Sequence, residues 1–160
     1  FTVLKYMNKV LVINGPNLNL LGTREPEIYG NNTLADIESI TLKLLKKIEV
    51  SCSIEWFQSN SESEIVDKIQ SLATDKVKDK VDLLVINSGA YSHTSVAILD
   101  ALKSISIAKI EVHLSHTLKR EEFRHKKLTA LGCDAVIEGL GAVGYFTAIS
   151  SHIFKKKFTK

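Results

Sequence analysis

Short aliphatic runs alternate with amphipathic helical stripes along this chain, and the alternation limits its fold more than any other feature. The runs rich in aliphatic and β-branched residues are predicted to be strands and cover residues 9–14, 50–58, 81–87, 109–113 and 134–138. Apolar residues at helical spacing predict helices between them, over residues 33–48, 61–72, 93–103 and 142–154. Strands and helices that alternate through short connections form a parallel sheet with helices on both faces.

The length of the chain selects among such folds. A (β/α)₈ barrel needs about 250 residues, whereas this chain has 160. Five strands therefore favour an α/β, flavodoxin-like doubly wound sheet in the order 2-1-3-4-5. We expect Thr33 to cap the first long helix, and Ser61 with Glu64 to form a capping box at the second. No linker or repeat interrupts the pattern, so residues 1–160 are predicted to form a single catalytic domain.

Composition excludes several classes of protein. Hydrophobic residues make up 44% and charged residues 24% of the chain, which is typical of a globular domain and not of a disordered one. No apolar run is long enough to span a membrane. A net charge of +3 is mild and indicates neither a nucleic-acid partner nor a membrane partner.

The two ends of the chain and the cysteines carry separate predictions. Met7 is the only methionine, so residues 1–6 are interpreted as a non-native or over-extended start. Lysines crowd residues 155–160, which are predicted to be a solvated, frayed tail. Cys52 and Cys133 lie far apart within or beside apolar runs, so we expect buried free thiols and a reducing, cytoplasmic setting.

Polar residues follow the first predicted strand in an unusually long loop, residues 15–32. The loop contains Arg24 and Tyr29. A phenol has a pKa near 10 and is a poor base at neutral pH, but a nearby guanidinium lowers that pKa. Arg24 and Arg120 are the candidates for this effect. The alternative is that Tyr29 packs on the surface and the arginines are simply solvated.

The loop after the third predicted strand, residues 88–95, offers a second candidate site. Gly89 allows close backbone approach, and the N-terminus of the following helix presents free N–H groups that could bind a carboxylate or phosphate. His93 lies at this helix start. It is interpreted either as a binding residue or as a structural residue near the helix cap.

The fourth predicted strand ends with Glu111 and His113, which point to the same face because side chains alternate along a strand. A hydrogen-bonded Glu–His pair can work as an acid. The spacing of His113, His116 and His125 fits no common zinc pattern, so no metal is predicted. The first loop has neither a dinucleotide-binding nor a P-loop glycine pattern, and no acidic pair that would indicate a phosphate-accepting receiver follows the first strand.

Three motifs together resemble the type II 3-dehydroquinate dehydratases. The first is VINGPNLNLLGTREP at residues 12–26, followed by Tyr29 and Gly30. The second is NSGAYSHTS at residues 87–95, and the third is IEVHLS at residues 110–115, followed by REEFR at 120–124. The motifs occur in the family's order between about Met7 and Tyr145.

The resemblance implies a cofactor-free hydro-lyase that reversibly converts 3-dehydroquinate to 3-dehydroshikimate, in aromatic amino acid biosynthesis or in quinate use. By motif position, Tyr29 is the base, and Arg24 lowers its pKa and closes over the substrate. Asn17 holds a water at the enolate oxygen. His113, oriented by Glu111, protonates the leaving hydroxyl.

The resemblance also implies the substrate contacts. Asn87 and His93 bind substrate hydroxyls, backbone N–H groups of Leu114 and Ser115 hold the carboxylate, Arg124 contacts a ring hydroxyl, and Arg120 supports the catalytic loop. The family forms dodecamers of four trimers, in which the residue matching Asp100 reaches a neighbour's site. Two positions depart from the family pattern: His116, which could add positive charge near the substrate, and Ser88.

One competing class stays open on the sequence. A flavodoxin-like binding module that holds a flavin or a phosphate ligand would have the same alternation of elements. Such a module would be yellow or phosphate-bound, whereas the lyase would be colourless and would generate a conjugated enone. A catalytically dead scaffold would lack Tyr29, Arg24 or His113, and all three are present.

Overall fold

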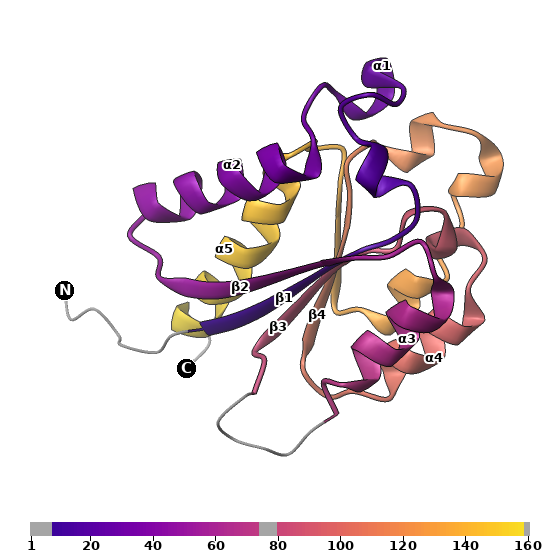
Figure 1. Ribbon diagram of the computed structural model, residues 1–160. Coiled ribbons are helices and arrows are strands. Elements are labelled where there is room, and N and C mark those ends of the chain that lie inside the picture. Colours follow the sequence, from indigo (N-terminus) through magenta and orange to yellow (C-terminus); the bar gives the residue numbers. More distant parts are fainter. Residues whose placement is uncertain (1–7, 74–79, 159–160) are drawn as a thin grey trace.

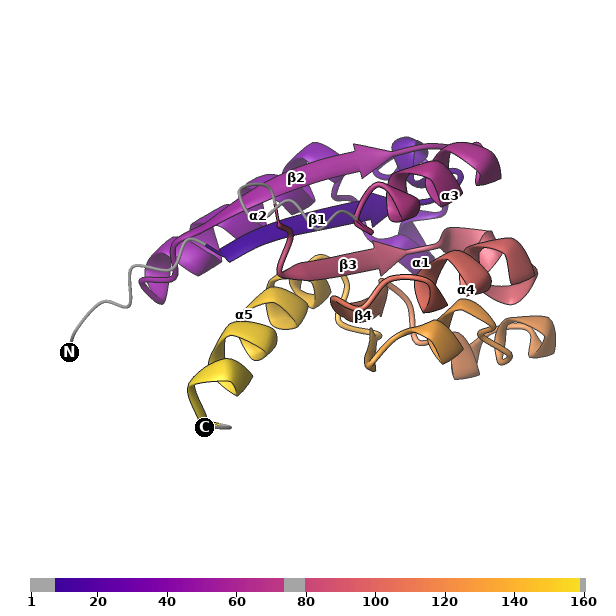
Figure 2. The same ribbon diagram turned by 90° about the horizontal axis from the view of Figure 1, so that it is seen from below.

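A computed structural model describes residues 8–73 and 80–158 and has a five-stranded parallel sheet at its centre (Figures 1 and 2). The strand order is β2-β1-β3-β4-β5, so the predicted flavodoxin-like fold and its order are confirmed. The strands are β1 (Asn8–Asn14), β2 (Cys52–Gln58), β3 (Leu83–Asn87), β4 (Ala108–His113) and β5 (Ala135–Glu138).

Long helices cover both faces of the sheet (Figure 1). Helices α2 (Leu34–Lys47) and α5 (Val143–Phe158) contact each other on one face, and α3 (Glu62–Gln70) and α4 (Val96–Lys103) contact each other on the opposite face. The loops at the carboxyl ends of the strands contain short helical turns: η1 (Leu18–Leu20), α1 (Pro26–Tyr29), η3 (Gly89–His93), η4 (Thr117–Lys119), η5 (Glu122–Arg124) and η6 (Thr129–Gly132).

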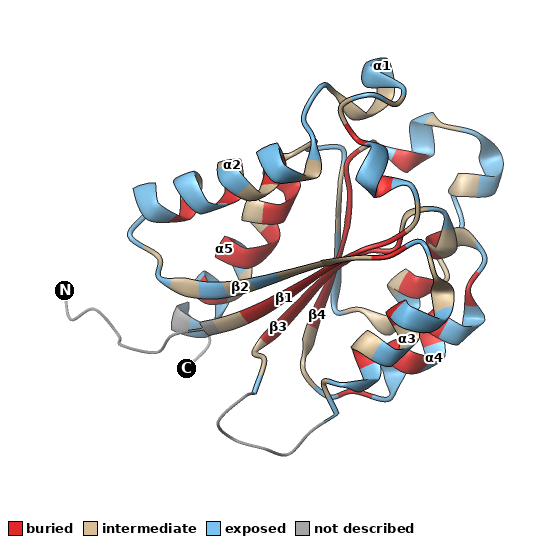
Figure 3. Ribbon diagram, in the orientation of Figure 1, coloured by how far each residue is buried: buried red, intermediate tan, exposed pale blue. Residues whose placement is uncertain are grey.

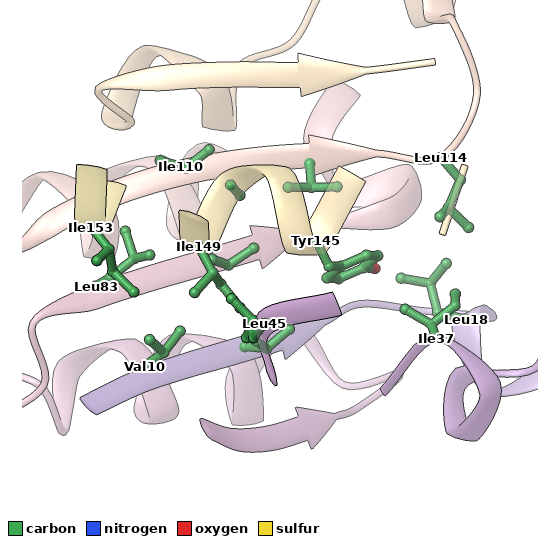
Figure 4. Close-up of a cluster of buried hydrophobic side chains, with 14 of the residues drawn as sticks. Val10, Leu18, Ile37, Leu45, Leu83, Ile110, Leu114, Tyr145, Ile149 and Ile153 are labelled. Carbon is green, nitrogen blue, oxygen red and sulfur yellow. The ribbon is translucent and has the colours of Figure 1, made fainter. Parts of the chain in front are cut away.

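Each central strand contributes to two hydrophobic cores because its side chains alternate between the faces. In β1, Val10 and Val12 pack in the core under α2 and α5, while Leu11 and Ile13 pack in the core under α3 and α4. The first of these cores is shown in Figure 4. Figure 3 shows that burial is concentrated in the central strands. Full burial of one such aliphatic side chain contributes about 1.5–3 kcal/mol, so the sheet is a rigid base for the loops at its edge.

The predicted helix over residues 93–103 is wrong at its start. Residues Gly89–His93 form the 3₁₀ turn η3, and α4 begins only at Val96, where the Ser95 side chain accepts a hydrogen bond from the Ile98 N–H at 2.9 Å. Ser95 is a better N-cap than His93 because its short hydroxyl reaches the free N–H groups of the first turn.

Two other helix starts can be compared with the predictions. Thr33 caps α2 as predicted, in a capping box with Asp36. The box at α3 is only half formed: Ser61 accepts from the Glu64 N–H, but the Glu64 carboxylate bonds to the hydroxyl of Ser59. Ser59 also accepts a hydrogen bond from the Ser61 N–H at 2.9 Å and so takes the place that the Glu64 side chain has in a full box.

The lysine-rich end, residues 155–160, was predicted to be solvated and frayed. Fraying is wrong for residues 155–158, since α5 continues to Phe158, but Lys155, Lys156 and Phe158 are exposed as predicted. Cys52 and Cys133 are free, as predicted, although each is half-buried rather than buried. Burial raises the pKa of both thiols, which keeps them protonated and unreactive at neutral pH. The predicted start at residues 1–6 lies outside the described residues.

Candidate active site

A pocket lies at the carboxyl ends of β1, β3 and β4, where doubly wound sheets bind their ligands. Residues of the loop that follows β1 and of the loop that follows β4 both line it. The residues lining this site pocket are Pro16, Asn17, Leu18, Leu21, Arg24, Tyr29, Asn87, Gly89, Ala90, His93, His113, Leu114, Ser115, Thr117, Arg120 and Arg124.

The loop after β1 brings Asn17 and Tyr29 to the pocket through two unusual turns. Asn17 has a φ of 67°, in the left-handed region that asparagine tolerates better than most residues, and its N–H donates to the Asn60 Oδ1 at 3.0 Å. Pro26 begins the single turn α1, which ends at Tyr29, and Gly30 closes the turn with a φ of 80°. These turns hold the phenol over the sheet edge without burying it.

Two guanidinium groups surround the Tyr29 ring, but they contact it differently. Arg120 Nη1 donates a hydrogen bond to the Tyr29 hydroxyl at 2.8 Å, and the Arg120 Cζ lies 5.2 Å from the ring centroid. The Arg24 Cζ lies 5.5 Å from the same centroid, while its Nε pairs with the Glu25 carboxylate at 3.1 Å. Arg120, and not Arg24, is therefore the cation that directly contacts the phenol oxygen.

The position of Arg120 is fixed by the short turns after β4. Its N–H donates to the Thr117 carbonyl at 3.1 Å, and its own carbonyl accepts from the His125 ring at 3.1 Å. Its side chain is only 11% exposed and also donates to the Ser115 hydroxyl at 3.4 Å. A cation in such a shielded place interacts with the phenol more strongly than one in water would.

At the end of β4, Glu111 and His113 form the hydrogen-bonded pair that the strand alternation predicts. His113 Nε2 lies 2.6 Å from Glu111 Oε1, and both side chains are buried, with Glu111 at 0% exposure. Because Nε2 is hydrogen-bonded to the Glu111 carboxylate, the other ring nitrogen, Nδ1, is the atom through which His113 can bind or exchange a proton with a ligand in the pocket.

His93 stacks on His113, with ring centroids 6.3 Å apart. Its Nδ1 lies 2.8 Å from the Lys126 carbonyl, and because a carbonyl only accepts, Nδ1 is the nitrogen that carries the proton. Burial is the main cause that lowers the pKa of His93. A neutral His93 therefore has Nε2 free of a proton, as an acceptor for a ligand hydroxyl.

Asn87 ends β3 and is held on two sides. Its Nδ2 donates to the hydroxyl of the buried Tyr145 at 3.0 Å, and its Oδ1 accepts from the Gly89 N–H at 3.1 Å. Gly89 has a φ of 56°, and a Cβ on it would lie 3.0 Å from the Pro16 carbonyl oxygen. An anion site at the start of an α-helix was predicted here, and this is wrong. The helix α4 begins only at Val96, and the Gly89 N–H donates to Asn87 Oδ1 instead of pointing freely to a ligand.

Two predicted residues lie outside the site pocket of their own chain. Asp100 is exposed on α4 and does not line the pocket. His116, expected near the substrate, does not line it either; its Nε2 faces the Glu138 carboxylate at 3.7 Å. The remaining predicted site residues all line the pocket except Glu111, which lies behind His113.

The charge of the site pocket is one-sided. Arg24, Arg120 and Arg124 line it, and among the residues that the structure describes no carboxylate does. In the described parts of the chain, no group of three His, Cys, Asp or Glu side chains could hold a metal ion. Within those same parts, no helix is long and apolar enough to cross a membrane.

Three buried residues at the site were not predicted as site residues, although Ser92 lies within the second motif. Ser92 and Thr129 both donate to Glu111, and Tyr145 holds Asn87 from α5. Each reaches the site across at least 18 positions in the sequence, and hydroxyl side chains in apolar surroundings have no periodicity that would single them out.

Known proteins share this sequence and this fold. A family model described as "Dehydroquinase class II" matches residues 8–153. A 3-dehydroquinate dehydratase of Clostridium botulinum is 54% identical over 143 residues, which cover 89% of this chain and 92% of that protein. One from Endomicrobium trichonymphae is 50% identical, covering 89% of this chain and 95% of that protein.

Solved structures agree. The type II dehydroquinase of Butyrivibrio crossotus has a TM-score of 0.82 at 46% identity, covering 91% of this chain and 97% of that one. The type II dehydroquinase of Propionibacterium acnes has a TM-score of 0.81 at 36% identity, covering 93% of this chain and 99% of that one. The match spans both sides of the site pocket and all three motifs. The chain therefore belongs to the class II dehydroquinase family, the type II 3-dehydroquinate dehydratases.

Proposed function

We propose that this type II 3-dehydroquinate dehydratase removes water from 3-dehydroquinate through an enolate, with Tyr29 as the base and His113 as the acid. The C2–H bond of the substrate is acidified only by the adjacent ketone. The Tyr29 phenolate takes that proton, and the electron pair moves into the enolate. When the enolate collapses, the C–O bond of the β-hydroxyl breaks and His113 supplies the proton with which the hydroxyl leaves as water.

The observation that supports this proposal best is that a phenol and an imidazole line one pocket and each has a charged partner. Arg120 donates to the phenol oxygen at 2.8 Å, which favours the phenolate. Glu111 accepts from His113 at 2.6 Å, which favours the imidazolium. The two partners have opposite charges and so favour opposite protonation states, as a base and an acid in one pocket require.

The other site residues are proposed to bind and orient the substrate. Three guanidiniums and no carboxylate line the site pocket, which suits an anionic ligand such as a hydroxy-acid carboxylate. Asn17 is proposed to hold a water against the enolate oxygen, since it lines the site pocket at the N-cap of η1. The proposed substrate contacts are made by Asn87, His93, Leu114, Ser115 and Arg124.

Arg24 is proposed to close over the substrate as part of the loop after β1. It pairs with the exposed Glu25, a contact that costs little to exchange for a ligand. Arg120 is proposed to do more than support the loop, because its guanidinium contacts the phenol oxygen directly.

The setting and assembly of the chain are also proposals. The chain is proposed to act in the cytoplasm as one catalytic domain without a cofactor, and to assemble as a dodecamer of four trimers. The exposure of Asp100 on α4 supports a role toward a neighbouring subunit, because the residue does not line the pocket of its own chain.

The decisive experiment incubates the purified protein with 3-dehydroquinate and follows near-ultraviolet absorbance. We expect absorbance to rise as the conjugated enone of 3-dehydroshikimate forms, and to fail to rise in the variant Tyr29→Phe. A wild-type protein that produces no enone, or a purified protein that is yellow from bound flavin, contradicts the proposal.

A further inference from the structure

We infer that Ser92 and Thr129 are positioning residues that act through Glu111 to keep His113 in its proton-donating form. The inference rests on the proposed role of His113 as the acid. Neither residue lines the site pocket, so neither can touch the substrate. Their hydroxyl groups instead complete the hydrogen bonding of the carboxylate behind His113.

Glu111 is an ionisable group in a place where charge is costly. Its side chain is 0% exposed, and an ionised carboxylate without partners in such surroundings would lose most of its favourable hydration. Three donors converge on it. Ser92 Oγ lies 2.7 Å and His113 Nε2 lies 2.6 Å from Oε1, and Thr129 Oγ1 lies 2.5 Å from Oε2.

The two hydroxyl groups belong to residues outside β4, the strand that contains Glu111. Ser92 belongs to η3 and Thr129 begins η6. The two turns are fastened together by a hydrogen bond from the Leu128 N–H to the Ser92 carbonyl at 2.7 Å and by a contact of 3.2 Å between the Ser92 and Thr129 hydroxyl oxygens. Both donors are thus held in place before a substrate binds.

The chemical effect follows from the charge on Glu111. Hydrogen bonds to the ionised form of a carboxylate favour that form, and an ionised Glu111 beside Nε2 favours the imidazolium form of His113. Only the imidazolium has a proton on Nδ1 to give to a leaving hydroxyl while Nε2–H stays bonded to Glu111. Loss of one hydroxyl donor destabilises the ionised form of Glu111 and so weakens the preference of His113 for the imidazolium form.

Other ionisable groups near this pair bear on its titration. His93 stacks on His113 from η3, and its lowered pKa leaves it neutral. Glu138, the last residue of β5, interacts electrostatically with His113, and Cys133, before β5, interacts with Glu111. Arg124 from η5 interacts with His93. None of these groups hydrogen-bonds to Glu111 within the described residues, so Ser92 and Thr129 are the donors to test.

The test measures the pH dependence of kcat in Thr129→Val and Ser92→Ala, with Thr129→Ser as the conservative variant. We expect the alkaline limb of the kcat profile to move down by about one pH unit in the first two variants, since a hydrogen bond to a charged group contributes on that order. At the upper end of the pH range, kcat should then fall about tenfold while KM changes little. Thr129→Ser should restore the wild-type profile.

Thr41→Val is the matched control. Thr41 is a buried threonine on α2 whose hydroxyl donates to the Ile37 carbonyl at 2.8 Å, away from the site pocket. It should lose stability as Thr129→Val does without moving the pH profile. If the folded Thr129→Val enzyme keeps the wild-type profile, or if Thr41→Val shifts it equally, the inference is wrong. If Thr129→Val does not fold, Ser92→Ala decides by the same criteria.

A second readout separates this inference from the proposed function. The ring nitrogens of His113 can be titrated by ¹⁵N NMR, with His113→Gln used for assignment. We expect the titration midpoint to fall in Thr129→Val, whether or not the enzyme turns over the substrate. An inactive wild-type protein would overturn the proposed function alone, whereas an unchanged midpoint in an active enzyme would overturn only the role of the two hydroxyls.

Discussion

The two halves of the site pocket are built in different ways. The acid half, named for the proposed acid, consists of Glu111 and His113 at the end of a buried strand, and hydroxyls from two further turns donate hydrogen bonds to the Glu111 carboxylate. The base half, named for the proposed base, consists of Tyr29 on a single helical turn in a long loop, and arginine side chains from outside that turn contact its ring and hydroxyl. One half is part of the folded core, and the other is placed over it.

This difference separates stability from catalysis. A change in the acid half disturbs buried, hydrogen-bonded groups and should affect both folding and turnover. A change in the base half removes a partly exposed group and should affect turnover almost alone. The proposed base, Tyr29, lies half-buried in a loop, while the proposed acid, His113, is buried at the end of β4.

The largest expected effect comes from the base half. Tyr29→Phe should lower kcat about 10³-fold, because general base catalysis typically contributes 10²- to 10⁴-fold. Its stability should fall by only about 1 kcal/mol, the value of one hydrogen bond. Tyr91→Phe is the matched control, since the Tyr91 hydroxyl donates to the Asn60 carbonyl at 2.8 Å and does not line the pocket. Near-normal turnover in Tyr29→Phe would remove the phenol from the mechanism.

A substitution in the acid half should lower both kcat and the free energy of unfolding. His113→Ala should lower kcat about 10²- to 10³-fold with little loss of substrate affinity. It should also lower the free energy of unfolding by about 3 kcal/mol, because it leaves the buried Glu111 without its ring partner. Steady-state kinetics and urea unfolding measure the two effects. A variant that loses activity but keeps full stability would contradict the distinction between the two halves.

Loss of the hydrogen bond between Arg120 and Tyr29 should lower kcat less than loss of Tyr29 or His113. Arg120→Met should lower kcat about 10- to 100-fold, since it removes a charge-assisted hydrogen bond to the phenol oxygen. Lys119→Met removes the same charge one position earlier on an exposed side chain and should leave kcat nearly unchanged. Equal effects of the two variants would mean that only net charge matters and not the 2.8 Å contact.

Protonation of histidines should affect stability modestly. Burial lowers the pKa of His93 in the site and of His152 on α5. The unfolded state therefore binds more protons than the folded state below the ordinary histidine pKa of about 6.5. The free energy of unfolding should fall as the pH is lowered from about 7.5 to about 5.5.

Substitution separates the two histidines. His93→Gln and His152→Gln should each flatten this pH dependence in urea unfolding, but only His93→Gln should also change turnover, because His152 does not line the site pocket. Curves that remain parallel to the wild-type curve would show that neither histidine is the source of the pH dependence.

Removal of metal ions is expected to have no effect on activity. Dialysis against EDTA should leave kcat and KM unchanged, because neither half of the site as proposed needs a metal. A loss of activity that added divalent cations restore would mean that the proposed acid and base are not sufficient for the reaction.

Much of the fold could be predicted because hydrophobic patterning is a local property. Runs such as residues 9–14 and 81–87 are apolar at nearly every position, and a strand buried on both faces needs this pattern. Helix caps were harder, because Ser95 and His93 compete for one helix start and only the path of the turn before α4 decides between them. The helical end of α5 was missed because its lysines resemble a solvated tail.

The sequence by itself determined the alternation of strands and helices, the edge of the sheet that carries the site, and the Glu111–His113 pair. Each of these depends on residues that are near one another in the chain. Only the tertiary structure decided that Arg120, 91 positions from Tyr29, contacts the phenol. It likewise decided that Ser92 and Thr129 meet at Glu111. Such contacts depend on the three-dimensional paths of irregular loops, which local periodicity does not encode.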